Sequence, residues 1–305
     1  MRTPEEIAAR AQRAAAAAAG AGRAVGLPVE EPTVLYDVFS VVVRLDPAPV
    51  VARVPTVLPP VRPPDVYAQQ QRELAVAGWL ASAGHPVACP SPLVPAVPMA
   101  HDGHSVTFWE RLEVLPSGEP SPADLGTGLA RLHSALRDCP VSLPVMAPLD
   151  ASIPAMLEWL KGRPDLLDPA DLARARREWA VLGPFLTSPG RLAARGTPVQ
   201  PIHGDAPTYN VLRTPTGSLD SDFEHACLGA VEWDLAFVGT EVLDAYDAAA
   251  PRPADRELVR LMEAGRMIQL VACHAMGPEL PSLVEGLRPV LASWRATPEV
   301  TDVDD

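Results

Sequence analysis

Acidic and amide side chains gather in one stretch of the sequence whose spacing suits chemistry on a phosphate. The stretch reads His203-Gly204-Asp205, with Asn210 five residues later and Asp222 twelve residues after that. Short β-branched runs flank them, so a loop is expected to aim Asp205 and Asn210 into one cleft and a hairpin to return Asp222 there. Phosphoryl transfer from a nucleotide needs one carboxylate to hold the acceptor hydroxyl, and a second carboxylate with an amide oxygen to hold Mg²⁺.

The same residues resemble the catalytic segment of a known family. His203-Gly204-Asp205, Asn210 and Asp222 are similar to the catalytic loop and metal-binding aspartate of the aminoglycoside phosphotransferase family of kinase-like small-molecule kinases. Three further segments resemble the family in sequence order: Arg72-Glu73, 129–133 and 233–236.

The resemblance implies a role for each matched residue. Asp205 would be the catalytic base, with Asn210 and Asp222 as Mg²⁺ ligands. His203 would brace the loop, and Asp234 would support it as the N-cap of a following helix. The implied cofactors are ATP or GTP with Mg²⁺. The implied partner is a small-molecule hydroxyl acceptor, either an antibiotic such as an aminoglycoside or a metabolite, so antibiotic resistance is one function the resemblance allows.

The phosphate-binding strand departs from the family pattern. The segment 50–54 reads Val-Val-Ala-Arg-Val, so Arg53 occupies the place of the usual lysine. Its planar fork suits both nucleotide phosphates and a bidentate pair with Glu73. The sequence has a single lysine, Lys161, and it lies in the helical half. If the protein binds a nucleotide as a kinase does, Arg53 must therefore hold the phosphates.

Two further segments are candidates for nucleotide contacts. The turn at 36–40 has no glycine, and Ser40 with its neighbouring backbone amides is the candidate phosphate contact there. The segment 108–112 falls where the hinge between two lobes is expected. Its backbone from Glu110 to Leu112 would hold the adenine edge.

Acidic side chains beyond the motif are candidates for acceptor contacts. Glu224 follows Asp222 by two residues, and a second metal, the substrate or a surface role are all open to it. Glu241 and Asp244 recur at helical spacing with Asp247. They would attract a cationic acceptor, or they form a solvated helix face.

The order of expected elements gives an α+β, protein-kinase-like two-lobe fold. An N-terminal helix (1–26) precedes a small β-rich N-lobe (27–113) with one main helix, and a larger helical C-lobe (114–305) carries the catalytic loop and acceptor pocket. The N-lobe strands are expected at 34–39, 40–45, 50–54, 87–93 and 105–112, around a helix at 65–83. The C-lobe helices are expected at 122–137, 153–161, 169–182, 233–248, 254–276 and 280–296.

Composition excludes several classes of function. The net charge of −13 argues against a nucleic-acid binder and against a polybasic membrane-surface protein. Four cysteines are far apart and without a CxxC pair, which is typical of free thiols in a reducing compartment. No signal peptide or long uncharged apolar run is seen, so the expected location is the cytoplasm.

Two other functions remain open at this point. The missing lysine and glycine loop suggest a catalytically impaired nucleotide-binding scaffold of the same fold. A metal-dependent hydrolase built on His203, Asp205, Asp222 and His225 is the third hypothesis, and it would act without a nucleotide.

Overall fold

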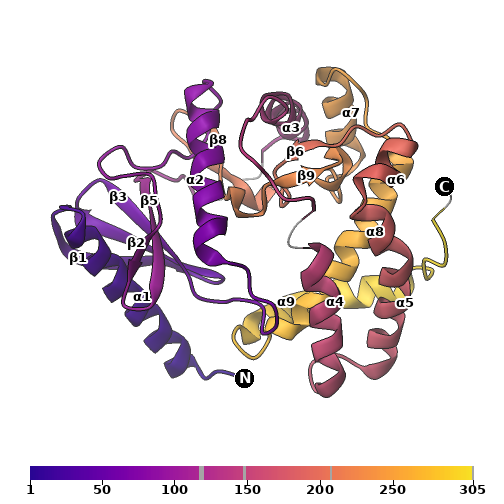
Figure 1. Cartoon of the computed structure of the whole chain (residues 1–305), viewed down its shortest axis with the longest axis horizontal. Helices are drawn as coiled ribbons and strands as arrows, with labels where there is room; N and C mark the ends of the chain where they lie inside the picture. The colour runs from indigo at the N-terminus through magenta and orange to yellow at the C-terminus, as the bar shows by residue number, and fades with distance from the viewer. Residues whose placement is uncertain (117–119, 147–148, 207, 304–305) are drawn as a thin grey trace.

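The N-lobe is built on an antiparallel sheet whose strand order is β1-β2-β3-β5-β4. The computed structural model describes residues 1–116, 120–146, 149–206 and 208–303. In Figure 1 the sheet and its helix α1 form the smaller lobe, and α2 stands between them and the helical C-lobe. The strands are β1 (Val29–Asp37), β2 (Ser40–Pro47), β3 (Val50–Pro55), β4 (Met99–His101) and β5 (His104–Glu110).

Alternation along β3 decides which side chains reach the cleft. Val50, Ala52 and Val54 are fully buried and pack into the core beneath α1, so Arg53 points to the opposite face of the sheet. That face is covered by α2 (Val66–Ser82), which carries Glu73. The alternation therefore directs Arg53 toward α2 and the space between the lobes.

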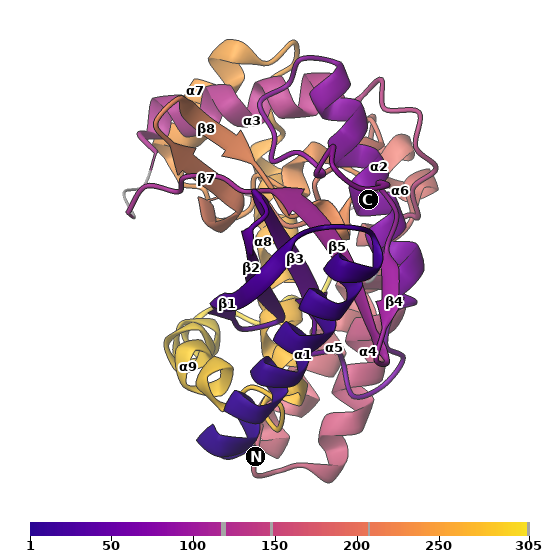
Figure 2. The same ribbon diagram turned by 90° about the vertical axis from the view of Figure 1, so that its left-hand side faces the viewer.

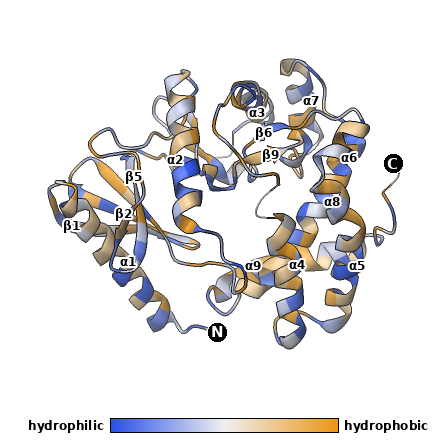
Figure 3. Ribbon diagram, in the orientation of Figure 1, coloured by the Kyte–Doolittle hydropathy of each residue, from blue (hydrophilic) through white to orange (hydrophobic). Residues whose placement is uncertain are grey.

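Helix α1 (Pro4–Ala24) covers the other face of the sheet, as Figure 2 shows. It begins with a capping box in which Thr3 and Glu6 bond to each other's backbone amides. Its alanines Ala14 and Ala18 are fully buried, since a small side chain lets the helix lie close to the strands. Figure 3 shows the hydrophobic residues of the sheet on which it packs.

The C-lobe is a set of helices around a large apolar core centred on Trp233. Two short strand pairs lie at its edge facing the N-lobe: β6 (Gln200–Ile202) with β9 (Cys227–Gly229), and β7 (Val211–Thr214) with β8 (Gly217–Asp220). The helices are α3 (Pro122–Leu136), α4 (Leu149–Trp159), α5 (Pro169–Leu186), α6 (Pro189–Ala194), α7 (Thr240–Ala249), α8 (Arg256–Ala272) and α9 (Pro281–Ala296).

Side chains at the N-terminal end of α1 also connect the N-lobe to the C-lobe. Arg10 Nη2 is 2.9 Å from Asp37 Oδ1 at the end of β1, and its Nη1 donates to the carbonyl of Glu279 in the C-lobe at 3.1 Å. Arg2 pairs with the side chain of the same Glu279. The turn between β1 and β2 is thus tied to the loop before α9.

The small antiparallel sheet beside a larger helical lobe confirms the predicted fold class. The expected strand at 87–93 is wrong, because prolines at 86, 90 and 92 remove amide donors from the segment. Only isolated bridges remain there, from Val87 to Asp220 and from Pro90 to Trp109.

The expected helix at 233–248 is also wrong at its start. A 3₁₀ turn ends at Trp233, and α7 begins only at Thr240. Phe237 and Gly239 between them have φ of 65° and 83°, values that a helix cannot contain. Among the described residues, no helix is long and apolar enough to cross a membrane.

Candidate active site

The loop that carries Asp205 is held by a buried carboxylate. Asp234 is fully buried, and its two oxygens accept hydrogen bonds from the amides of His203 (2.8 Å) and Gly204 (2.9 Å). His133 contacts the same carboxylate at 3.2 Å. Burial alone would raise the pKa of Asp234, but the hydrogen bond and charge of His133 hold it below its ordinary value. Asp234 is the C-cap of the 3₁₀ turn, and Gly239 is the N-cap of α7, so the expected role of Asp234 as an N-cap is wrong.

The turn before Asp205 admits only glycine. Gly204 has a φ of 83°, and a Cβ at this position would lie 2.1 Å from the carbonyl oxygen of His225. The Gly204 carbonyl in turn accepts a hydrogen bond from the Trp233 indole at 2.9 Å. Donors and acceptors of the loop backbone are therefore satisfied by fixed, buried groups.

The Asp205 carboxylate is half-exposed and lies between two cationic groups. Arg266 Nη2 on α8 lies 3.0 Å from Oδ1, and His225 Nδ1 lies 3.9 Å from Oδ2. Burial opposes ionisation of Asp205, but His225 and Arg266 together bring its pKa well below its ordinary value. Burial would likewise lower the pKa of His225, yet Asp205 and the nearby Glu224 raise it to about 9. Asp205 is thus held as a carboxylate.

Arg266 is absent from the sequence-based set of site residues. It lies sixty-one residues beyond Asp205, on a helix with no motif of its own. Its guanidinium also lies 5.3 Å from the centre of the Trp233 ring. The one available signal was an arginine beside the buried positions Gly265 and Ile268 of an amphipathic helix.

Asn210 and Asp222 are brought together by hydrogen bonds through Ser221. The Ser221 amide and hydroxyl donate to the Asn210 carbonyl at 2.9 and 3.0 Å. The His203 ring bonds the Ser221 carbonyl at 2.9 Å, and the Asn210 side chain donates to the Asp205 carbonyl at 2.8 Å. Asp222 itself has left-handed backbone dihedrals, with φ of 64°. The Asp205 loop and the Asp222 loop therefore form one hydrogen-bonded unit.

Arg53 lies against three carboxylates at the boundary between the lobes. Its Nη1 donates to both oxygens of Glu73 at 2.9 Å, so the predicted pair is present. Its Nη2 lies 2.9 Å from Asp222 Oδ1 and 2.7 Å from Glu224 Oε2. Gln69 of α2 donates to the Glu224 carbonyl at 3.2 Å, which fixes α2 to this loop.

Three carboxylates, those of Glu73, Asp222 and Glu224, surround the single guanidinium of Arg53. Burial raises the pKa of Glu73, and the positive charge of Arg53 opposes that rise. Burial also raises the pKa of Asp222, whereas for Glu224 the charges of Arg53 and His225 outweigh burial and lower it. Asp222 Oδ1 is buried and accepts no hydrogen bond from the described residues, because Arg53 Nη2 is close but poorly aligned. The group thus has room for further positive charge.

The remaining nucleotide candidates lie at two ends of the N-lobe sheet, since Ser40 pairs with Pro55 at the end of β3 and Glu110 with Val50 at its start. Ser40 is buried at the first position of β2. Burial and the charge of Asp222 raise the pKa of Tyr36, which precedes the β1–β2 turn. Glu110 ends β5, and its amide already donates to the Cys89 carbonyl at 3.0 Å. A nucleobase would have to use other backbone groups between Glu110 and Leu112.

The acidic residues of α7 are not joined to this site. Helix α7 packs along α3, and Arg256 pairs with Asp244 at 2.9 Å and Asp247 at 2.7 Å. Glu241 is exposed on the same helix. Within the described chain, no hydrogen bond or ion pair connects these side chains to Asp205.

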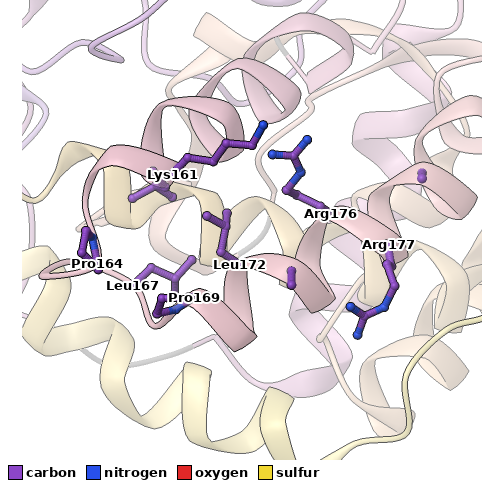
Figure 4. Close-up of a pocket in the computed structure, with 10 residues that line it drawn as sticks. Lys161, Pro164, Leu167, Pro169, Leu172, Arg176 and Arg177 are labelled. Atoms are coloured by element: carbon purple, nitrogen blue, oxygen red, sulfur yellow. The ribbon is translucent and has the colours of Figure 1, made fainter.

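A surface hollow of about 590 Å³ lies elsewhere in the C-lobe, between α5 and the turn and loop that precede it (Figure 4). Its cations are already paired: Lys161 and Arg176 with Glu158 at 2.7 and 3.1 Å, and Arg177 with Glu299 at 2.7 Å. It is separate from the Asp205 and Asp222 loops and carries no functional argument.

Solved structures with the same fold are numerous. The GDP and kanamycin complex of APH(2")-IIia is 15% identical, with a TM-score of 0.65 over 91% of this chain and 97% of the other. A choline/ethanolamine kinase family protein from Mesorhizobium loti is 19% identical, with a TM-score of 0.54 over 95% and 96%. The choline kinase LicA from Streptococcus pneumoniae is 12% identical, with a TM-score of 0.59 over 87% and 95%.

These similarities are too low to show more than a shared fold. Among curated proteins, no sequence matches this chain. The family model described as the phosphotransferase enzyme family, however, matches residues 34–266, from β1 to the helix that carries Arg266. That range includes Arg53, Asp205 and Asp222, and it covers most of the chain. The chain therefore belongs to the phosphotransferase enzyme family.

Proposed function

We propose that this phosphotransferase moves the terminal phosphoryl group of ATP or GTP to a hydroxyl of a small molecule, with Mg²⁺. The observation that carries the proposal is the hydrogen-bonded unit of two loops, in which Ser221 ties Asn210 to the segment of Asp222 and the Asn210 side chain bonds the Asp205 carbonyl. Membership of the family supports the reaction type. A base, two oxygen ligands for a cation and a phosphate clamp are the groups that this reaction needs.

Asp205 is proposed as the base that orients the acceptor hydroxyl and takes its proton. Arg266 holds Oδ1 at 3.0 Å, and the Asn210 amide holds the backbone beside it. The carboxylate is still partly open to solvent, as an acceptor site requires. Because Asp205 is ionised, it can accept a proton at the moment the phosphoryl group is transferred.

Asn210 and Asp222 fit a divalent cation that is completed by the nucleotide. Among the described residues, no group of three or more His, Cys, Asp or Glu side chains is arranged to hold a metal alone. Mg²⁺ commonly uses one or two protein carboxylates together with substrate phosphates. The buried, unbonded Oδ1 of Asp222 and the nearby Glu224 suit such a shared site. When bound, the cation would neutralise charge developing on the phosphates.

The acceptor is proposed only as a class. One protein with this fold was solved with kanamycin, and others are choline kinases, so an aminoglycoside, another antibiotic or an amino alcohol are all candidates. Glu241 and Asp244 would contact a cationic acceptor only if it extended as far as α7. The cytoplasm is proposed as the location, on the sequence evidence alone.

Within the described part of the chain, no cluster of three or more His, Cys, Asp or Glu side chains supports a metal-dependent hydrolase. The scaffold hypothesis is separated from the kinase by experiment. The full chain would be screened against hydroxylated antibiotics and metabolites for consumption of ATP and of GTP with Mg²⁺. Asp205→Asn should lower turnover of the best acceptor by about 10³-fold, the range typical of a lost general base, and leave nucleotide binding intact. Unchanged turnover would contradict the role of Asp205, and binding of nucleotide without transfer to any acceptor would favour the scaffold.

A further inference from the structure

Both terminal nitrogens of Arg53 are already in contact with carboxylates. Nη1 bonds the two oxygens of Glu73 at 2.9 Å, and Nη2 lies 2.9 Å from Asp222 and 2.7 Å from Glu224. A guanidinium has only its two terminal nitrogens and Nε as donors. Nη2 therefore cannot bind a phosphate group while it stays on Asp222 and Glu224.

The oxygens that Nη2 contacts are the ones a divalent cation would need. Hard cations prefer carboxylate oxygens, and Asp222 Oδ1 is buried without a hydrogen bond from the described residues. A guanidinium nitrogen and a cation on one oxygen would repel each other strongly at such separations. Only one of the two positive charges can stay at Asp222.

We propose that Arg53 is a placeholder for the cation in the nucleotide-free protein, and that its Nη2 moves from Asp222 and Glu224 to the phosphates when metal and nucleotide bind together. The proposal rests on the proposed function and extends it, because it couples the two ligands through one side chain. Nη1 keeps its two bonds to Glu73 throughout, so the movement needs only a turn of the guanidinium about that anchor.

The coupling depends on arginine at this position. A lysine carries all its donors on one compact nitrogen, which cannot span Glu73 on one side and two further carboxylates on the other. The metal should raise the affinity for nucleotide, and by thermodynamic linkage the nucleotide should raise the affinity for metal by the same factor. Without nucleotide, Asp222 and Glu224 should bind a cation weakly.

The test is a calorimetric titration of the full chain with Mn²⁺ alone, without nucleotide or acceptor. Arg53→Met should bind Mn²⁺ at least ten times more tightly than the wild type, and Arg53→Lys should lie between them. Adding Asp222→Asn to Arg53→Met should abolish the gain. Arg44→Met is the matched control, because Arg44 lies on the neighbouring strand with a pair to Asp46, and its Mn²⁺ affinity should equal that of the wild type.

A second measurement covers the case in which Arg53→Met does not fold. The ATP affinity of the wild type and of Arg53→Lys is compared with and without Mg²⁺, and the factor by which Mg²⁺ tightens ATP should be at least fivefold smaller in the lysine variant. Equal Mn²⁺ affinities in the wild type and a folded Arg53 variant, or an equal Mg²⁺ factor, would overturn the placeholder.

These outcomes separate this proposal from the proposed function. The Mn²⁺ shift in a protein that transfers no phosphate would support the placeholder and count against the kinase. Normal phosphate transfer together with an equal Mn²⁺ affinity in the wild type and Arg53→Met would support the kinase and count against the placeholder.

Discussion

Asp205 and Asp222 lie on neighbouring loops, but different interactions hold them. The loop of Asp205 is held through its backbone by buried side chains. Asp234 accepts hydrogen bonds from the amides of His203 and Gly204, and the Trp233 indole donates to the Gly204 carbonyl. Asp222 has a left-handed backbone, and its side chain lies at ion-pair distance from the charged Arg53. Its loop is joined to the Asn210 segment through Ser221 and to α2 through Gln69.

This difference indicates that the Asp205 loop is preformed, whereas the contacts of Asp222 with Arg53 can change. Backbone hydrogen bonds to a buried carboxylate do not exchange with ligands, so they hold Asp205 ready for an acceptor. Ion pairs among three carboxylates and one guanidinium can be exchanged for other charges, such as a cation and phosphates. The proposed base Asp205 therefore has a fixed support, and the proposed nucleotide side has a replaceable one.

Removing the fixed support should have the largest effect on stability. Asp234→Ala leaves the amides of His203 and Gly204 without their acceptors in a fully buried place. Each such group costs roughly 1–3 kcal/mol, so urea unfolding should show a loss of about 4 kcal/mol. The control Asp244→Ala removes an exposed aspartate whose pair with Arg256 lies on the surface, and it should leave the midpoint unchanged. Similar losses in the two variants would contradict the comparison.

Gly204→Ala should have the next largest effect. The new Cβ would meet the carbonyl oxygen of His225 at 2.1 Å, so the loop must shift in addition to adopting a strained φ. We expect a loss of about 3 kcal/mol and a marked fall in turnover. Gly26→Ala is the control, because Gly26 has a φ of 87° with open space around it, and strain alone should cost about 1 kcal/mol there. Equal losses in the free energy of unfolding at both positions would contradict tight packing around Gly204.

Glu73→Gln should have the smallest effect on stability, because it tests the replaceable side. The amide oxygen still accepts from Arg53, and one charge is removed from a group that has too many carboxylates. The free energy of unfolding, measured by thermal denaturation, should change by less than about 1 kcal/mol. The KM for nucleotide should rise about tenfold, the value of one charged hydrogen bond, because Arg53 loses half of its anchor. A stability loss as large as that of Asp234→Ala would show that both supports are fixed.

The catalytic motif and the lobe order were predictable because both depend on local sequence. The spacing from Asp205 to Asn210 and Asp222 predicted a loop and a hairpin, and β7 and β8 are the strands of that hairpin. The arginine in place of the usual lysine was also visible in the sequence, and its pairing with Glu73 was predicted from the resemblance to the kinase-like family.

Other features of the fold and the site were not predicted from the sequence. Arg266 comes to Asp205 from a helix sixty-one residues away, and no spacing rule links the two. The strand expected at 87–93 failed because its prolines leave too few amide donors for a ladder, and β4 formed instead from a shorter segment. Helix α7 began late because residues between Trp233 and Thr240 adopt positive φ.

The sequence by itself determined that this chain carries an aspartate, an asparagine and a second aspartate at kinase-like spacing, with an arginine in place of the lysine. These features are local, so residue type and spacing suffice to define them. Only the tertiary structure decided that Arg53 rests on Asp222 and Glu224, that Arg266 contacts the Asp205 carboxylate, and that Asp234 binds the backbone just before it. Such contacts form when separate helices and loops pack on one core, and packing depends on the whole chain.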